Sequence, residues 1–148
     1  MHGTTAGGEA SASWKVTHRW TLSPGYALMK MHLHTDPTSQ DITSVPDYEG
    51  SSPVQQAQLR SHVDLSHGLA WDTAAYFVDA LPFQQVPSYT RLDTHFSWQL
   101  THELTLSVVG QNLVKDHHLE SQDFISLVNS SQPKRSIYAK ITWQSAGR

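Results

Sequence analysis

The 148-residue chain has no cysteine, so it can form no disulfide and offers no thiolate ligand for a metal. It has no apolar run of 18 residues and no leader with a charged start and an apolar core. The sequence therefore predicts neither a membrane helix nor a signal peptide. Its net charge is -3, which leaves no basic surface for nucleic acid. None of these absences excludes a membrane β-barrel, because barrel strands are short and half polar.

The sequence does contain repeated alternation of apolar and polar residues. In residues 89–100, the even positions from Leu92 to Leu100 are mostly apolar and the odd positions are polar. This period of two predicts a strand with one apolar and one polar face. The same pattern predicts strands at residues 10–21, 26–34, 57–65, 71–78, 104–108 and 137–143. The Gly-rich first nine residues fit either a frayed end or part of another strand.

The connections between these strands alternate in length. Short turns are expected at residues 23–25, 66–68 and 101–103, and long connections at residues 35–54, 80–88 and 114–134. In an up-and-down meander, alternate connections lie at the same end of the sheet. We therefore predict an all-β fold, an antiparallel up-and-down meander of about seven strands. Short turns at one rim and long loops at the other are typical of an incomplete segment of a transmembrane β-barrel.

Aromatic residues support the same interpretation. Tryptophan and tyrosine are enriched where a membrane protein meets the membrane–water interface. Five aromatic residues are predicted to form a girdle at the short-turn rim: Trp20, Tyr26, Trp71, Trp98 and Trp143. Trp14 is expected farther up its strand. Chance placement of aromatics at strand ends is the alternative.

The chain resembles a known family over nearly its whole length, from about Ala10 onward, and its ending carries the most specific motifs. Four stretches resemble the C-terminal end of a TonB-dependent outer-membrane receptor. They are V-P-S-Y-T-R-L-D (86–93), W-Q-L (98–100), L-S-V-V-G-Q-N-L (106–113) and K-R-S-I-Y-A-K-I-T-W (134–143). The family's Gly-x-Asn-Leu element corresponds to Gly110 and Asn112, which we interpret as structural. After Trp143 the chain continues to Arg148, whereas the family usually stops at an aromatic residue.

The resemblance implies that residues 1–148 are the C-terminal part of a 22-stranded receptor barrel in the bacterial outer membrane. Such a parent protein would bind an iron chelate, a vitamin or a glycan and import it with energy from TonB. Its partners would be outer-membrane lipid, the rest of the barrel, a plug domain, TonB through that plug, and the small ligand. No plug is recognised in this sequence. The chain alone is expected to transport nothing and to aggregate through its open strand edges.

A binding module and an enzyme are the alternatives to a receptor. A soluble all-β ligand-binding module that recognises a glycan would use the same strands, with two apolar faces packed together. An enzyme is not predicted, because no spacing brings two carboxylates together as an acid–base pair. The charged strand residues are expected to line a polar lumen in pairs: Arg60, Asp64, Asp72, Arg91, Asp93 and Lys140. No cofactor is predicted.

Histidines and the long loops supply the remaining candidate sites. His32 and His34 share a strand face, and His117 and His118 follow one another in a loop with Asp116 and Glu120 nearby. No third ligand is fixed by spacing, so no metal site is predicted and these residues are interpreted as polar-face or rim residues. Long loops carry binding function on a rigid scaffold. The predicted ligand contacts are Asp47, Tyr48, Glu49, His117, His118 and Phe124.

Overall fold

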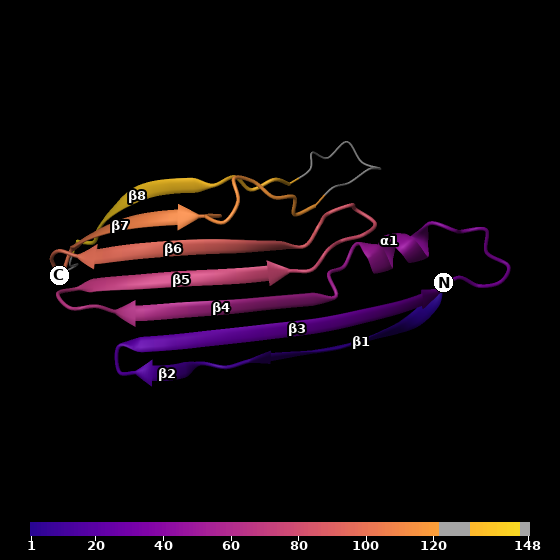
Figure 1. The fold of residues 1–148 in the computed structure, drawn as a ribbon, viewed down its shortest axis with the longest axis horizontal. Helices are drawn as coiled ribbons and strands as arrows, with labels where there is room; N and C mark the ends of the chain where they lie inside the picture. Colours follow the sequence, from indigo (N-terminus) through magenta and orange to yellow (C-terminus); the bar gives the residue numbers. More distant parts are fainter. Residues whose placement is uncertain (122–130, 146–148) are drawn as a thin grey trace.

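The computed structural model describes residues 1–121 and 131–145 as one antiparallel sheet with a short helix at its margin (Figure 1). The elements in chain order are β1 (His2–Ser11), β2 (Trp14–Thr17), β3 (Trp20–His34), α1 (Ser44–Gly50), β4 (Gln55–Asp64), β5 (Leu69–Val78), β6 (Tyr89–Gln99), β7 (Leu104–Gln111) and β8 (Ser136–Trp143). The strand order is β1-β3-β4-β5-β6-β7-β8, with β2 also paired to β3. The predicted meander is confirmed, with eight strands rather than about seven.

The first turn lies elsewhere than the sequence predicted. Residues 23–25 are inside β3, and the chain reverses at His18 and Arg19 instead. The carbonyl of Pro24 accepts the Ala12 N–H at 3.1 Å, so the proline nitrogen faces the same neighbour and has no hydrogen to donate. The strand predicted over residues 10–21 is interrupted there, between β1 and β2. Proline acts here as a break in an edge ladder rather than as a turn residue.

The first nine residues belong to β1, one of the two alternatives that the sequence left open. β1 runs antiparallel to β3, from the pair His2 and His34 to the pair Ser11 and Gly25. A Cβ at Gly7 would lie 2.4 Å from the Leu28 carbonyl oxygen, so glycine permits a close approach of these two backbones.

The connection over residues 35–54 contains α1, which the sequence did not predict. A helix of seven residues is too short to show a 3.6-residue period. Asp41 stabilises the turn that leads into α1, because its carboxylate accepts hydrogen bonds from the backbone N–H groups of Thr43 and Ser44, each at 3.0 Å. The Glu49 carboxylate accepts the Leu33 N–H at 2.6 Å, which fixes α1 beside the end of β3. Within the described residues, no helix is long and apolar enough to cross a bilayer.

The two other short turns are where the sequence placed them. His67 and Gly68 have φ of 62° and 74°, a left-handed pair that turns the chain between β4 and β5. Residues 101–103 connect β6 to β7. The short turns lie together at one end of the sheet, and α1 lies at the other with the long connections (Figure 1).

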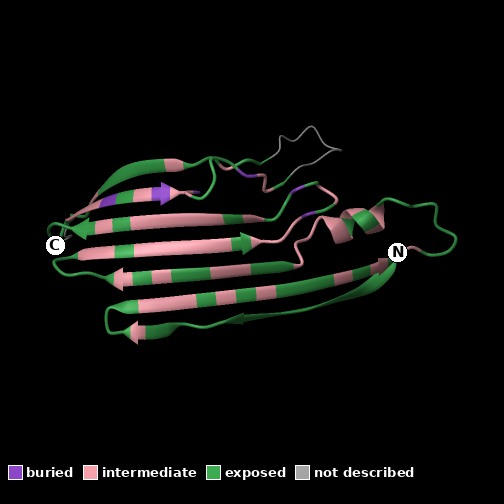
Figure 2. Ribbon diagram, viewed as in Figure 1, coloured by how far each residue is buried: buried purple, intermediate pink, exposed green. Residues whose placement is uncertain are grey.

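The sheet encloses almost no core. Among the described residues, the buried hydrophobic side chains are Leu81 and Val86, and both lie in the loop after β5 (Figure 2). The accessible surface is 10704 Å², whereas a compact monomer of this mass would expose about 7,600 Å². The single sheet therefore leaves both faces for something else to cover.

Candidate functional site

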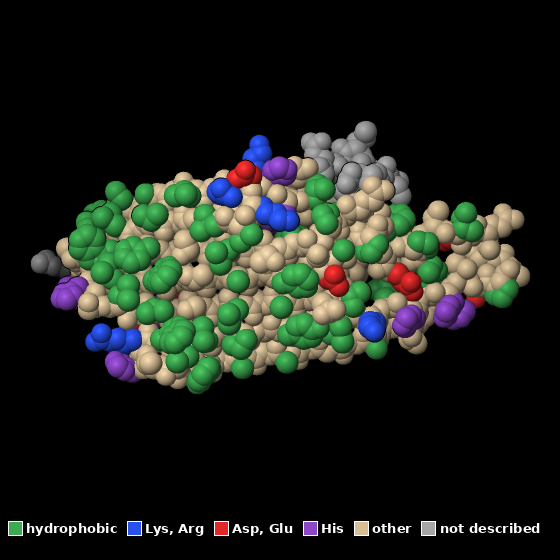
Figure 3. All heavy atoms as spheres, in the orientation of Figure 1, with side chains coloured by type: hydrophobic (Ala, Val, Ile, Leu, Met, Phe, Trp, Pro, Cys, Tyr) green, Lys and Arg blue, Asp and Glu red, His purple; other side chains and the backbone are tan. Residues whose placement is uncertain are grey.

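The register assigns every strand residue to one of two faces, because directly paired residues point to the same side of a sheet. One side, here called the apolar face, has no charged residue between its two margins. Its main hydrophobic members are Trp20, Leu22, Leu28, Leu59, Val63, Trp71, Ala75, Phe77, Leu92, Phe96, Trp98, Leu106, Val108, Ile137, Ala139, Ile141 and Trp143. Many remain open to solvent, with Ile141 71% and Trp71 49% exposed. Figure 3 shows hydrophobic side chains spread over the strands and charged side chains mainly at the margins.

All five tryptophans lie on the apolar face along one oblique line. Trp20 and Trp71 are both opposite Val63, whereas Trp98 and Trp143 lie progressively closer to the short turns. Trp14 pairs with Leu22, on the other side of Trp20. The line shifts by about one residue per strand, and at ~3.3 Å per residue and ~4.8 Å between strands this is an inclination of about 35°.

This line corrects two details of the sequence analysis. Trp14, which was expected to lie apart from the other tryptophans, continues their line on β2. Tyr26 was placed beside a turn, but it lies inside β3 opposite Ala57, and its hydroxyl donates to Gln55 Oε1 at 2.8 Å. Tyr26 is therefore in the interior of the apolar face, away from the short-turn rim.

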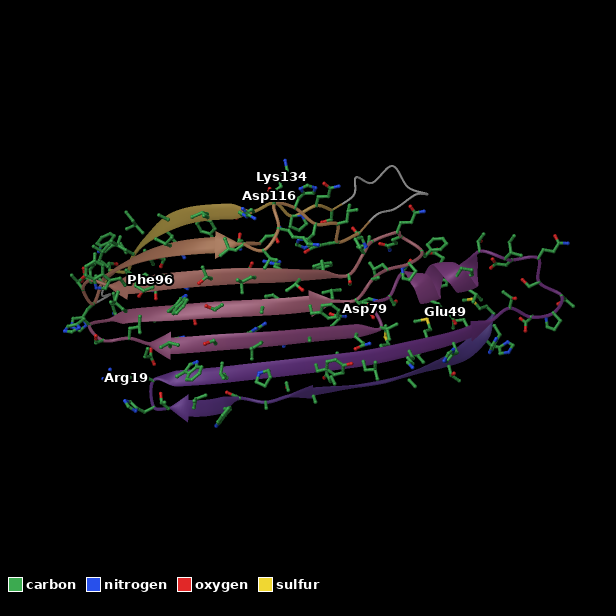
Figure 4. The ribbon with its side chains drawn as sticks, viewed as in Figure 1. Arg19, Glu49, Asp79, Phe96, Asp116 and Lys134 are labelled. Atoms are coloured by element: carbon green, nitrogen blue, oxygen red, sulfur yellow. The ribbon has the colours of Figure 1, made fainter. Side chains whose placement is uncertain are left out.

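A second line bounds the apolar face at the long-loop end. It is marked by Lys30 in β3, by Asp79 directly after β5, and by Arg135 directly before β8 (Figure 4 labels Asp79). Along each strand, these residues lie about eight to ten positions from the tryptophan line. At ~3.3 Å per residue and an inclination of 35°, the uncharged band between the two lines is about 22–27 Å tall.

The opposite face, here called the polar face, carries all six charged strand residues that the sequence placed there. The predicted pairing is confirmed for Asp64, Asp72, Arg91 and Asp93, whereas within the described residues Arg60 and Lys140 form no ion pair. His62 Nδ1 lies 2.6 Å from Asp72 Oδ1, and His95 Nδ1 lies 3.4 Å from Asp72 Oδ2. Arg91 forms an ion pair with Asp93 at 2.7 Å. A hollow of about 320 Å³ lies among these residues.

The long-loop rim is held by a buried polar junction. Asn112 ends β7 with φ 53° and is 1% exposed. Its Nδ2 donates to the Pro133 carbonyl at 3.0 Å, and its Oδ1 lies 3.1 Å from Nδ1 of the buried His118. The His118 ring stacks on Tyr89 with centroids 4.2 Å apart. These contacts fasten the loop after β7 to the start of β6 and agree with the structural role predicted for Asn112.

A small hollow of about 200 Å³ opens beside this junction. It is lined by residues 87–89 and by four residues of the loop after β7, Lys115, His117, His118 and Leu119. Lys115 was not among the residues selected from the sequence. Only the contact between the two loops, which the sequence does not reveal, places Lys115 in the wall of a hollow.

The predicted ligand contacts fall in three places. His117 and His118 line the hollow, although His118 also holds the loop. Asp47, Tyr48 and Glu49 lie in α1, where Asp47 accepts the Ser51 hydroxyl at 3.0 Å and Tyr48 is 55% exposed. Phe124 lies outside the described residues. In residues 1–121 and 131–145, no three His, Asp or Glu side chains are arranged to hold a metal ion.

Comparison with solved structures identifies the fold. The chain matches the ferric yersiniabactin uptake receptor FyuA from Yersinia pestis, with a TM-score of 0.73 and 18% identity over 94% of this chain and 23% of that one. It also matches the siderophore receptor PiuA from Acinetobacter baumannii, with a TM-score of 0.69 and 19% identity over 95% of this chain and 22% of that one.

A third match is the pyoverdine outer-membrane receptor FpvA from Pseudomonas aeruginosa, with a TM-score of 0.67 and 17% identity over 95% of this chain and 21% of that one. The chain has the fold of a barrel segment from a TonB-dependent outer-membrane receptor. This barrel segment spans about a fifth of the length of the receptors that it matches. No protein-family profile and no curated protein matches the sequence.

Proposed function

We propose that the chain is part of the wall of an outer-membrane receptor, with the apolar face against lipid and the polar face toward the barrel lumen. The observation that carries this proposal is the uncharged band between the two parallel lines. Its height of about 22–27 Å agrees with the apolar band of outer-membrane barrels, which is ~25 Å tall.

The inclination of the tryptophan line supports the same placement. Barrel strands tilt by ~35–45° from the membrane normal, so residues at equal depth lie on a line that crosses the strands obliquely. The five tryptophans follow such a line at about 35°. Tryptophan favours the membrane–water interface because its ring is apolar and its N–H is polar. We infer that the tryptophan line lies at one interface and the charged line at the other.

The ligand is proposed by analogy with the matched receptors. We infer that the parent protein is a receptor rather than an enzyme, and that it takes up an iron chelate of the siderophore class with energy from TonB. The support is that the solved structures with this fold include receptors for yersiniabactin, pyoverdine and other siderophores. The remaining barrel strands, a plug and the TonB contact would be supplied by the rest of the parent protein.

The long-loop rim is the proposed contact surface for this ligand. Lys115 and His117 place a cation and an imidazole at the mouth of the hollow, and the exposed Tyr48 offers a ring on α1. Iron chelates commonly carry negative charge or aromatic groups, which suit these side chains. In the complete receptor, we expect Lys115→Ala with His117→Ala to weaken chelate binding about tenfold, whereas His102→Ala at the short-turn rim leaves it unchanged. Equal effects of both changes would contradict this contact surface.

A simple expression experiment tests the wall itself. Produced in water without detergent, the chain should be insoluble, because a face of this height is left uncovered and both outer strands have open edges. Detergent micelles should keep it in solution with the circular dichroism of a β-sheet. A soluble, monodisperse monomer that unfolds cooperatively without detergent would overturn the proposal.

A soluble monomer would instead support the alternative of a soluble all-β module. A sandwich requires a second layer of sheet against the apolar face. The described residues form a single layer, so no observation favours this alternative.

A further inference from the structure

We propose that Lys30, His32 and His34 of β3, with His2 of β1, form a contact for the phosphate group of an anionic membrane lipid. These four residues are called the basic cluster. The inference rests on the membrane placement proposed above and adds a ligand to one margin of the wall. The contact would hold lipid headgroups at the long-loop side of the membrane.

The register places the basic cluster on the lipid side of the wall. Lys30, His32 and His34 continue the alternation of Leu28, so they share its face. β4 ends at the pair Gln55 and Leu28, and beyond it β3 pairs only with β1 among the named strands. The protruding ribbon of β1 and β3 is visible in Figure 1, next to α1.

The pairs across this ribbon bring the histidines together. His2 is directly opposite His34, and their ring centroids are 6.1 Å apart. Thr4 lies opposite His32 and Ala6 opposite Lys30. These small neighbours leave the long side chains open to solvent. The ribbon therefore presents one ammonium and three imidazoles on a single exposed surface.

The depth of the basic cluster matches that of lipid phosphates. Lys30 lies on the charged line, at the end of the uncharged band. His32 and His34 extend about 5 and 11 Å farther along the membrane normal, at ~3.3 Å per residue and an inclination of 35°. The lysine stem can lie along apolar surface near Leu28 while its ammonium reaches the headgroups.

Among the described residues, a nearby acid engages His2 but none engages Lys30 or His32. Asp36 lies 3.3 Å from His2 Nδ1 and 3.1 Å from the Met1 amino group. Glu49 is engaged by the Leu33 N–H. Within the described part of the chain, neither Lys30 nor His32 forms a hydrogen bond or an ion pair with another side chain. Asp79, the acid at similar depth, lies two strands away on β5.

Ammonium and imidazole N–H groups are donors for phosphate oxygens, and a lysine near an anionic membrane surface adds about a fivefold gain in binding. Asp36 and Glu49 oppose the positive charge of the cluster, and the Met1 amino group adds to it.

Vesicle flotation tests this contact. The whole chain, diluted from detergent, is offered to vesicles of phosphatidylcholine and to vesicles that also contain phosphatidylglycerol. We expect preferential binding to the anionic vesicles, reduced about fivefold by Lys30→Gln. The double change of His32→Ala and His34→Ala should also reduce this preference, because it removes two imidazole donors for phosphate oxygens. Lys15→Gln is the matched control, because it removes the same charge from the polar face.

The outcomes separate the two proposals. Binding to both kinds of vesicle without preference would contradict the lipid contact, as would an equal loss of binding for Lys15→Gln and Lys30→Gln. Neither result would contradict the proposed membrane placement of the sheet. Failure to bind any vesicle would instead contradict the proposed function.

Discussion

At the scale of single residues, Asn112 makes the most demanding contacts. It combines a left-handed backbone, nearly complete burial and side-chain bonds to Pro133 and His118. Its own N–H donates to Asp93 Oδ1 at 2.9 Å, and so ties the end of β7 to β6. The sequence predicted a structural role for Asn112. It could not reveal the bonds to the loop, because those partners lie 6 and 21 residues away.

Replacement of Asn112 should separate the contribution of its side-chain hydrogen bonds from that of its left-handed backbone. Asn112→Ala removes both side-chain bonds and keeps a Cβ at positive φ, so we expect a loss of about 2–3 kcal/mol in the free energy of unfolding in detergent. Asn112→Gly removes the same bonds but tolerates the backbone, and should recover about 1 kcal/mol of that loss. Equal losses for the two variants would show that the left-handed backbone contributes little.

Asp41 makes the start of α1 sensitive to acid. Hydrogen bonds from Ser44 first, and then from Thr43, lower the pKa of the Asp41 carboxyl from 3.8 to about 2. Because the pKa is lower in the folded state, its stabilising effect is complete above about pH 4 and is lost as the pH falls toward 2. Amide hydrogen exchange in α1 should accelerate across that range in the native chain. Asp41→Asn should abolish this pH dependence, and a variant that kept it would contradict the assignment.

At the scale of elements, alternation predicted the strands well, because each strand's own residues carry the signal. The turn predicted at residues 23–25 was wrong, because a proline that interrupts the hydrogen bonds of an edge strand gives the same sequence signal as a turn. The tryptophan line was only partly visible, because its slope depends on the register between strands. The basic cluster was hidden for the same reason, since His2 meets His34 only across the pairing of β1 with β3.

Adjacent residues of β7 offer a matched test of the two faces. Val108 is on the apolar face near the middle of the uncharged band, and Val109 points to the polar face. Val108→Arg should cost about 2–4 kcal/mol in lipid, the penalty for arginine at the bilayer midplane. Val109→Arg should cost clearly less, because that face is polar. The measurement is urea unfolding in lipid vesicles, and a larger penalty at Val109 would reverse the assignment of the faces.

At the scale of the whole molecule, the described residues form a single open sheet rather than a compact domain. Its accessible surface of 10704 Å² is far above that of a compact protein, and its match to solved receptors covers about a fifth of their length. A single-layer sheet needs its apolar face covered, and our proposal is that lipid covers this face and that the rest of a barrel encloses the other. The family resemblance, which extends over nearly the whole sequence, predicted this architecture. The choice of an iron chelate among the three ligand classes that the sequence suggested is a proposal, and its only support is the structural comparisons.

The central claim is that the apolar face lies in lipid, and spin labels on β7 test it most directly. The chain has no cysteine of its own, so single-cysteine variants at Leu106, Ser107, Val108 and Val109 each carry one label. In lipid vesicles, we expect labels at Leu106 and Val108 to collide with oxygen and to be shielded from a water-soluble nickel complex, with Val108 the deeper. Labels at Ser107 and Val109 should show the opposite preference. Access of the nickel complex to all four positions, without alternation, would contradict the account.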